Sequence, residues 1–251
     1  MANAVQQTPE YGRVIGLTTP QANTTVEPEM QHLLGAGAFS VLCARLTSPL
    51  ADSRARLLDY FDRLPATLAQ FDVAPLAAAG FACTGSCYLV GRAAEEERLA
   101  SATRAGYPVI SSAQAILAAL AALGAKRVAL LSPYPAWLSE AGQQYWRDCG
   151  ITLTAVAGLP EDLLDTRHIY RLTTARVQEV LAGLDTRGAD AVLLSGTGMP
   201  TLRTIAARAA GVPVLSSNLC LAWRLAAAAG GATALEPWLA PQAAWRQRLD
   251  N

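Results

Sequence analysis

The chain has 251 residues, of which 52% are hydrophobic and 16% are charged, and its formal net charge is zero. This composition supplies ample apolar material for a buried core. The chain lacks the basic clusters that a nucleic-acid or anionic-membrane partner requires, and no window reaches the roughly 18 uncharged apolar residues of a membrane span.

The first residues lack the basic start and apolar core of a secretory signal. The five cysteines are an odd number without the spacing of a disulfide framework. Both observations predict a cytoplasmic protein with free thiols.

Short β-branched runs alternate with longer amphipathic runs along the chain, which predicts an α/β fold with parallel sheets and crossover helices. Thr24 and Glu27 have the spacing of a capping box. Pro65 is expected to break or kink the helix that contains it. The charged run 95–97 indicates a helix face exposed to solvent. The expected strands are 13–17, 39–45, 73–80, 108–110, 127–131, 151–157, 189–194 and 213–215. The expected helices are 24–34, 51–71, 88–105, 113–124, one ending near 149, 173–184, one beginning at Pro200, and 218–230, with a tail, 232–251, that packs across the body.

The two halves of the chain repeat each other. The sequence Cys83-Thr-Gly-Ser aligns with Gly196-Thr-Gly-Met, 113 residues later, and segment 106–112 aligns with segment 211–217. We therefore expect two similar Rossmann-like lobes, each a mostly parallel sheet flanked by helices, related by pseudo-twofold symmetry. The expected division places residues 1–112 and 218–251 in one lobe and residues 113–217 in the other, with the active site in the cleft between them. The Ala-rich helices are compatible with a homodimer or a larger homo-oligomer.

Four predicted loops follow the carboxyl ends of strands, where doubly wound sheets bind their ligands. Their small residues expose backbone N–H groups that can bind one carboxylate or two. The chain lacks GxGxxG and GxxxxGK[ST] sequences, which argues against dinucleotides and nucleoside triphosphates. Both histidines, His32 and His168, lie outside these loops, so no hydrolase triad can be assembled, and Cys83 and Cys87 have no cluster of metal ligands nearby. The loops are 18–25, 81–86, 132–135 and 195–200.

Cys83 is the main candidate for chemistry, because it ends a predicted strand beside Thr-Gly-Ser. A helix N-terminus lowers the pKa of a thiol from about 8.5 toward neutrality, which favours the nucleophilic thiolate. The alternative interpretation is a small buried core residue. Tyr134 is placed either to donate a hydrogen bond to a bound carboxylate or to pack beside its prolines. Asn23 is placed either to bind the same anion or to cap a turn.

Three motifs resemble those of the maleate cis–trans isomerase and arylmalonate decarboxylase branch of the aspartate/glutamate racemase superfamily. They are the segment from Pro20 to Glu29, the sequence Ser132-Pro-Tyr134, and Val214-Leu-Ser-Ser-Asn218 followed by Trp223. The resemblance implies two Rossmann-like lobes, no cofactor, no metal and a cleft for small dicarboxylates. Members carry a catalytic cysteine at one or both of two mirrored positions, which match Cys83 and Gly196, so the second cysteine is missing here.

The resemblance implies a cofactor-independent isomerase of a small unsaturated dicarboxylate such as maleate. The Cys83 thiolate would add to the double bond, and an enediolate-like intermediate would rotate and eliminate. Two alternatives remain open: decarboxylation of a disubstituted malonate with Cys83 as proton donor, and non-catalytic binding of small acids. The implied catalytic residues are Cys83 and Tyr134, and the implied substrate-binding residues are Asn23, Thr84, Gly85, Ser86, Gly196, Thr197 and Gly198.

Overall fold

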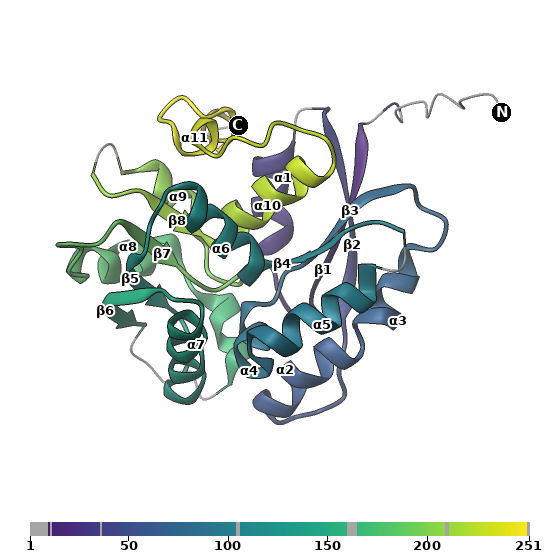
Figure 1. The fold of residues 1–251 in the computed structure, drawn as a ribbon, viewed down its shortest axis with the longest axis horizontal. Helices are drawn as coiled ribbons and strands as arrows, with labels where there is room; N and C mark the ends of the chain where they lie inside the picture. Colours follow the sequence, from purple (N-terminus) through teal and green to yellow (C-terminus); the bar gives the residue numbers. More distant parts are fainter. Residues whose placement is uncertain are drawn as a thin grey trace.

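The strands of the protein form two parallel sheets of four strands each in a computed structural model, which describes residues 10, 12–35, 37–103, 106–159, 165–208 and 211–249 (Figure 1). The strand order is β2-β1-β3-β4 in the first sheet and β6-β5-β7-β8 in the second, which is the same order shifted by four strands. Helices flank both sheets (Figure 1). The predicted α/β architecture of two similar lobes is therefore confirmed.

The first half of the chain supplies the first sheet. Its strands are β1 (Arg13–Pro20), β2 (Phe39–Leu46), β3 (Leu76–Phe81) and β4 (Val109–Ser111), and its helices are α1 (Val26–Leu34), α2 (Ser53–Asp62), α3 (Leu64–Leu68), η1 (Ala69–Phe71), α4 (Thr84–Val90) and α5 (Arg92–Ala102). The rest of the chain contains the strands β5 (Arg127–Ser132), β6 (Thr152–Gly158), β7 (Ala191–Leu194) and β8 (Val214–Ser216), and the helices α6 (Ser112–Ala122), α7 (Ala136–Asp148), η3 (Thr166–Arg171), α8 (Thr174–Gly183), α9 (Leu202–Ala206), α10 (Ser217–Ala228), α11 (Glu236–Leu239) and α12 (Ala244–Gln247).

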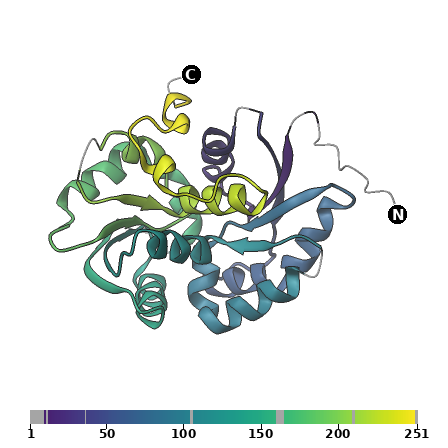
Figure 2. The same ribbon diagram turned by 45° about the horizontal axis from the view of Figure 1, so that its top comes forward.

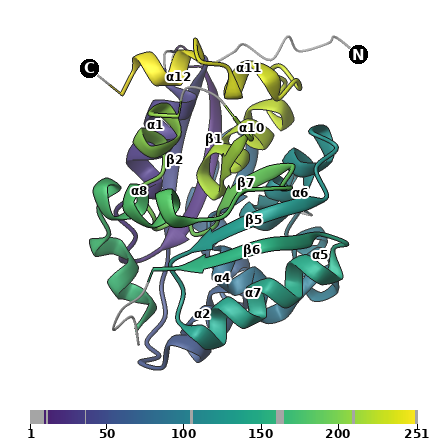
Figure 3. The same cartoon turned by 90° about the vertical axis from the view of Figure 1, so that its left-hand side faces the viewer.

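Helices α6 and α10 lie side by side between the two sheets (Figure 2). They start at the repeated Ser-Ser pair, because Ser111 accepts a hydrogen bond from the N–H of Gln114 and Ser216 accepts one from the N–H of Leu219, as helix-capping serines do. Helix α10 follows β8 of the second sheet but contacts α1 and β3 of the first. The strands of the two sheets run in clearly different directions (Figure 3). The repeat thus places matching loops of the two lobes near each other.

The capping box predicted from Thr24 and Glu27 is wrong. Helix α1 begins at Val26, and the side chain of Asn23 accepts hydrogen bonds from the N–H groups of Thr25 and Val26 at 2.9 and 3.1 Å. An asparagine before a helix competes well for these N–H groups. Glu27 instead forms an ion pair with Arg45.

The two longest predicted helices are each divided. The segment 51–71 breaks at Arg63, so that Pro65 falls in the first turn of α3, where its missing N–H costs little. The segment 88–105 instead starts at Thr84 and is interrupted at Gly91, whose φ of 75° favours glycine.

The prediction of a solvated face for the run 95–97 is wrong for its first residue. Glu96 and Glu97 are exposed, but Glu95 is buried. The Glu95 carboxyl accepts hydrogen bonds from the hydroxyl groups of Ser111 and, at 2.5 Å, Tyr145. Burial raises the pKa of Glu95, and these partners explain how a carboxyl group is accommodated there.

The C-terminal tail packs across the body, as predicted. Arg246 donates to the carbonyl group of Ala206 at 3.0 Å, and Arg248 donates to that of His32 at 2.6 Å. The tail therefore bridges α9 and α1. Within the described part of the chain, no helix combines the length and apolar character needed to cross a bilayer.

The carboxylate of Glu29 joins α1 to the second half of the chain. It accepts hydrogen bonds from the N–H groups of Thr201 and Leu202 at 2.5 and 3.0 Å, and from the side-chain amide of Asn218 at 2.8 Å. Burial raises the pKa of Glu29, and these hydrogen bonds oppose the rise. The same amide donates to the carbonyl oxygen of Thr197 at 3.0 Å, so the contact extends to the turn after β7.

Replacing Glu29 should destabilise the protein. The variant Glu29→Ala leaves four buried donors, including the hydroxyl of Thr201, without their acceptor, and we expect the free energy of unfolding to fall by about 3–5 kcal/mol. Urea unfolding followed by circular dichroism measures this change. The control Glu96→Ala removes an exposed carboxylate and should change the free energy by less than about 0.5 kcal/mol. A loss below about 1 kcal/mol for Glu29→Ala would contradict the bridging role.

Candidate active site

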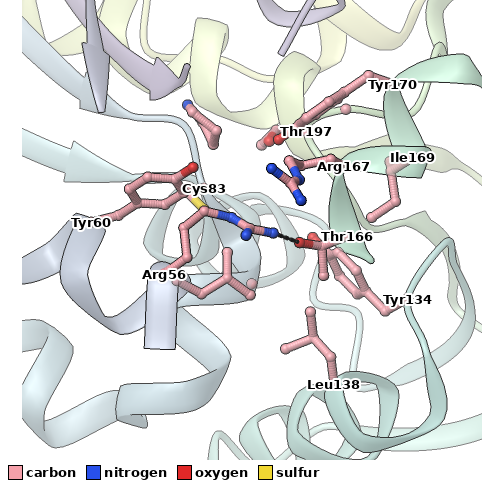
Figure 4. A pocket seen from close by; sticks show the side chains of 14 residues that line it. Arg56, Tyr60, Cys83, Tyr134, Leu138, Thr166, Arg167, Ile169, Tyr170 and Thr197 are labelled. Carbon is pink, nitrogen blue, oxygen red and sulfur yellow. Dashed lines mark hydrogen bonds between the residues drawn. The ribbon is translucent and has the colours of Figure 1, made fainter. Parts of the chain in front are cut away.

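A pocket lies where the carboxyl ends of strands from the two sheets face each other (Figure 4). Its free volume is about 30 Å³, enough for about two water molecules. The lining comes from both lobes: Pro20, Arg56, Leu57, Tyr60, Cys83, Gly85, Tyr134, Leu138, Thr166, Arg167, Ile169, Tyr170, Thr197 and Gly198.

Cys83 lies at the start of α4 and is only 4% exposed, yet it lines the pocket. Its sulfur is 3.2 Å from the hydroxyl oxygen of Ser86, which itself donates to the carbonyl group of Leu57 at 2.6 Å. The Ser86 oxygen is thus an acceptor for the thiol hydrogen. Backbone N–H groups of Gly85 and Ser86 also bond to the sulfur.

The predicted lowering of the Cys83 pKa is wrong. Burial raises the pKa of this thiol, because the thiolate loses its hydration, and the hydrogen bonds from Ser86 and Gly85 reduce the rise without reversing it. The first turn of α4 therefore stabilises the thiolate less than burial destabilises it. At neutral pH Cys83 is a thiol that must lose its proton before it can act as a nucleophile.

The turn after β7 approaches Cys83 from the second lobe. The hydroxyl of Thr197 donates to the carbonyl oxygen of Ala82 at 3.0 Å, immediately before Cys83. The side-chain amide of Asn23 lies 3.4 Å from the Thr197 hydroxyl oxygen. Two turns related by the sequence repeat are thus hydrogen-bonded to each other, and Asn23 supports one of them.

Gly196 occupies the position that mirrors Cys83, and no side chain fits there. Its φ is 153°, and a Cβ atom would lie only 2.7 and 2.8 Å from the ring carbons of Pro133. The same Cβ would be 3.7 Å from the hydroxyl oxygen of Tyr134. Backbone geometry and the proline ring therefore exclude a cysteine, and the Tyr134 phenol lies next to the place it would occupy.

Tyr134 points its hydroxyl group toward Thr84, at an oxygen–oxygen distance of 2.6 Å. Burial raises the pKa of Tyr134 well above its ordinary value, so the phenol stays protonated at neutral pH. It can therefore donate a hydrogen bond to an anion in the pocket.

The residues that the sequence singled out fall into two groups. Some line the pocket, and the others lie behind a lining residue and contact it through a hydrogen bond or close packing. The lining group is Cys83, Gly85, Tyr134, Thr197 and Gly198, and the supporting group is Asn23, Thr84, Ser86 and Gly196.

Sequence reasoning missed the contributions of α2 and η3. Arg56 and Tyr60 come from α2, which follows β2, and Arg167 and Tyr170 come from η3, which follows β6. Only the loops after β1, β3, β5 and β7 were considered as candidates. All strands of a parallel sheet end at the same edge, so the segments after β2 and β6 could have been included on that ground alone.

The pocket lining contains two cations and no carboxylate. Arg56 is 2% exposed, and its guanidinium donates to one carboxylate oxygen of Asp165 at 2.9 Å. The guanidinium of Arg167 donates to the other oxygen at 2.8 Å. The hydrogen bonds of Arg167 and the charges of both arginines hold the pKa of Asp165 far below its usual range. The lining thus suits an anionic ligand.

Two further lining residues, Tyr60 and Tyr170, are neutral donors. Burial raises the pKa of Tyr60 to about 12 and raises that of Tyr170 well above its ordinary value. Both phenols are protonated at neutral pH. Among the described residues, no group of three or more His, Cys, Asp or Glu side chains could hold a metal ion.

Comparison with known proteins identifies the family. The family model for arylmalonate decarboxylase matches residues 15–236. The chain is 31% identical to the maleate isomerase of Geobacillus stearothermophilus over 231 residues, which cover 84% of this chain and 89% of the relative. The chain belongs to the arylmalonate decarboxylase family of enzymes, in the branch that includes the maleate isomerases.

Solved structures agree with this assignment. A cysteine-to-serine variant of the Nocardia farcinica maleate cis–trans isomerase, with a covalently bound succinylcysteine intermediate, superposes with a TM-score of 0.78 at 25% identity, covering 87% of this chain and 93% of that one. Arylmalonate decarboxylase itself has the same fold, with a TM-score of 0.68 at 24% identity over 87% of this chain and 93% of that one.

A cysteine at position 196 should not be tolerated. We expect Gly196→Cys to lower the free energy of unfolding by about 2–4 kcal/mol, because it combines an unfavourable φ with a clash against Pro133. Chemical denaturation measures the loss. The control is Gly183→Ala, in a helix where nothing lies within 4 Å of the added Cβ, and it should be neutral or slightly stabilising. Equal stability of Gly196→Cys and the parent protein would show that the turn can rearrange.

Proposed function

We propose that this protein is a cofactor-independent, cysteine-dependent cis–trans isomerase of a small unsaturated dicarboxylate such as maleate. The observation that carries the proposal is a single thiol, Cys83, in the lining of a pocket whose charged lining residues are both cations. The kinship with the Geobacillus stearothermophilus maleate isomerase supports it, and so does the succinylcysteine intermediate held by the Nocardia farcinica enzyme.

The reaction needs one sulfur atom. The Cys83 thiolate adds to one alkene carbon, which forms a carbon–sulfur bond and moves the π electrons onto the neighbouring carbon and its carboxylate. The central carbon–carbon bond is then single and can rotate. The electrons return, the carbon–sulfur bond breaks, and the trans acid leaves with the thiolate restored. No atom is gained or lost overall, so a second thiol at Gly196 is not required.

Tyr134 is placed to stabilise the intermediate. Its protonated phenol can donate to the enediolate-like carboxylate, and Thr84 fixes the direction of that hydroxyl through the bond of 2.6 Å. The N–H groups of Gly85 and Ser86 stabilise the sulfur when it leaves as thiolate. Thr197, supported by Asn23, bounds the pocket on the opposite side.

The charge of the pocket favours isomerisation over decarboxylation. Loss of carbon dioxide is helped by apolar surroundings, because they disfavour the charged carboxylate in the ground state. A guanidinium group does the opposite and stabilises that carboxylate. With Arg56 and Arg167 in the lining, a reaction that keeps both carboxylates fits the pocket better.

The decisive test is turnover followed by nuclear magnetic resonance in deuterated water, with maleate and phenylmalonate as separate substrates. We expect fumarate from maleate and a loss of roughly three orders of magnitude or more in Cys83→Ser, because no other group supplies the nucleophile. Cys149→Ser removes a half-exposed thiol at the end of α7 and should retain activity. A chiral deuterated monoacid from phenylmalonate would instead identify a decarboxylase. Absence of turnover with either acid would leave only ligand binding.

The rate should increase with pH. Since burial raises the pKa of Cys83, the thiolate is scarce at neutral pH, and kcat/KM should rise about tenfold per pH unit below that pKa and level off above it. Steady-state kinetics from about pH 7 to pH 9 measure the slope. Alkylation of Cys83 by iodoacetamide should follow the same pH profile and be slowed by maleate. A flat profile would mean that thiol ionisation does not limit the reaction.

A further inference from the structure

The carboxylate of Asp165 lies between the guanidinium groups of Arg56 and Arg167. This site would also suit the carboxylate of a ligand. One of its oxygens accepts from Arg56 at 2.9 Å and the other accepts from Arg167 at 2.8 Å. Guanidinium groups form strong, charge-assisted hydrogen bonds to carboxylate oxygens and are often used to bind carboxylate ligands. Both arginines line the pocket with Cys83 (Figure 4), whereas Asp165 is not among the lining residues.

Because the guanidinium group of Arg56 is buried, its positive charge needs a negatively charged partner. Its side chain is 2% exposed, and a buried guanidinium without a counter-charge costs several kcal/mol. The carbonyl group of Ala51 and the hydroxyl group of Ser53 accept from it at 2.8 and 3.0 Å, but both are neutral. Asp165 supplies the negative charge while the pocket is empty of ligand.

Displacement of Asp165 would enlarge the pocket. The free volume beside the two arginines is about 30 Å³. The Arg167 side chain is 49% exposed and Asp165 is 23% exposed, so both reach solvent, and a ligand carboxylate that takes over the bonds of Asp165 offsets their loss. Moving Asp165 away from Arg56 would free space beside the pocket and would leave the Arg56 guanidinium available to a ligand carboxylate.

Building on the isomerase function proposed above, we infer that Arg56 and Arg167 bind the second carboxylate of the substrate, and that Asp165 holds this position in the ligand-free protein. The first carboxylate lies near Tyr134 and Cys83, where the chemistry takes place. Binding exchanges one carboxylate for another at the arginines, so the buried charge stays paired throughout. The exchange selects dicarboxylates, since a monocarboxylate has no group to replace Asp165.

The chain contains a matched control for this site. The sequence Leu-Asp-Thr-Arg occurs twice, at 164–167 and again at 184–187. In the second copy Arg187 also bonds to its own aspartate, Asp185, at 2.7 and 2.9 Å, but Arg187 is 90% exposed and lies outside the pocket. Equivalent substitutions in the two copies therefore separate the binding role from the local turn.

The test measures equilibrium affinity by calorimetry in a Cys83→Ser background, which prevents turnover. The ligands are maleate and isocrotonate, in which a methyl group replaces one carboxylate. We expect Arg167→Gln to weaken maleate about tenfold and to leave isocrotonate within about twofold. Asp165→Asn should tighten maleate, because the competing charge is gone while the side chain keeps its shape. Arg187→Gln and Asp185→Asn should change neither affinity.

The other outcomes separate the inference from the isomerase function. Equal weakening of maleate and isocrotonate by Arg167→Gln would assign Arg167 a structural role, and weaker maleate binding by Asp165→Asn would show that Asp165 does not compete. If the parent protein turns over maleate but Arg167→Gln does not change the affinity for maleate, the inference about the arginines is wrong and the isomerase function stands. If maleate binds through the arginines but is not turned over, the isomerase function is wrong and the inference stands. If maleate does not bind at all, both are wrong.

Discussion

The active site depends on hydrogen bonds that hold the loops of two lobes together across a buried seam. Glu29 binds the first turn of α9 and the amide of Asn218, which in turn reaches the carbonyl group of Thr197. The hydroxyl of Thr197 then contacts Ala82, next to Cys83. Because these groups are buried, each lost partner carries the full penalty of an unpaired polar group. The position of the sulfur relative to the second lobe follows from this chain of contacts.

The repeated architecture also explains why the candidate site has a thiol on one side only. In one lobe the strand–helix turn carries Cys83, and in the other the equivalent turn carries Gly196 pressed against the ring of Pro133. A mechanism that uses two opposed thiols has no place for its second group here. Addition and elimination by a single sulfur need only one, and the hydroxyl of Tyr134 lies 3.7 Å from where the Cβ of a residue at position 196 would be.

The ion pair between Arg56 and Asp165 is the second interaction that shapes the pocket. A guanidinium as buried as that of Arg56 needs a negative partner in every state of the protein. Asp165 meets this need from a different lobe, across 109 residues of sequence. The contact ties α2 of the first lobe to η3 of the second, so the wall of the pocket is assembled from both lobes.

Local signals in the sequence were enough for the architecture and for part of the site. The alternation of strands and helices and the repeat around Cys83 and Gly196 predicted two like sheets, because strand and turn patterns depend on neighbouring residues. The polar turns at strand ends predicted that Tyr134 and Thr197 would face the same pocket, since parallel strands end at one edge.

The tertiary structure alone decided the ionisation of Cys83, the burial of Glu95 and the convergence of Arg56 with Arg167. Each depends on how much water and which distant charge surround a side chain after packing. A helix start beside Cys83 predicts a lowered pKa, but burial by both lobes reverses the direction. The pairing of charges across lobes has no local signature, because the partners meet only when the two sheets are joined.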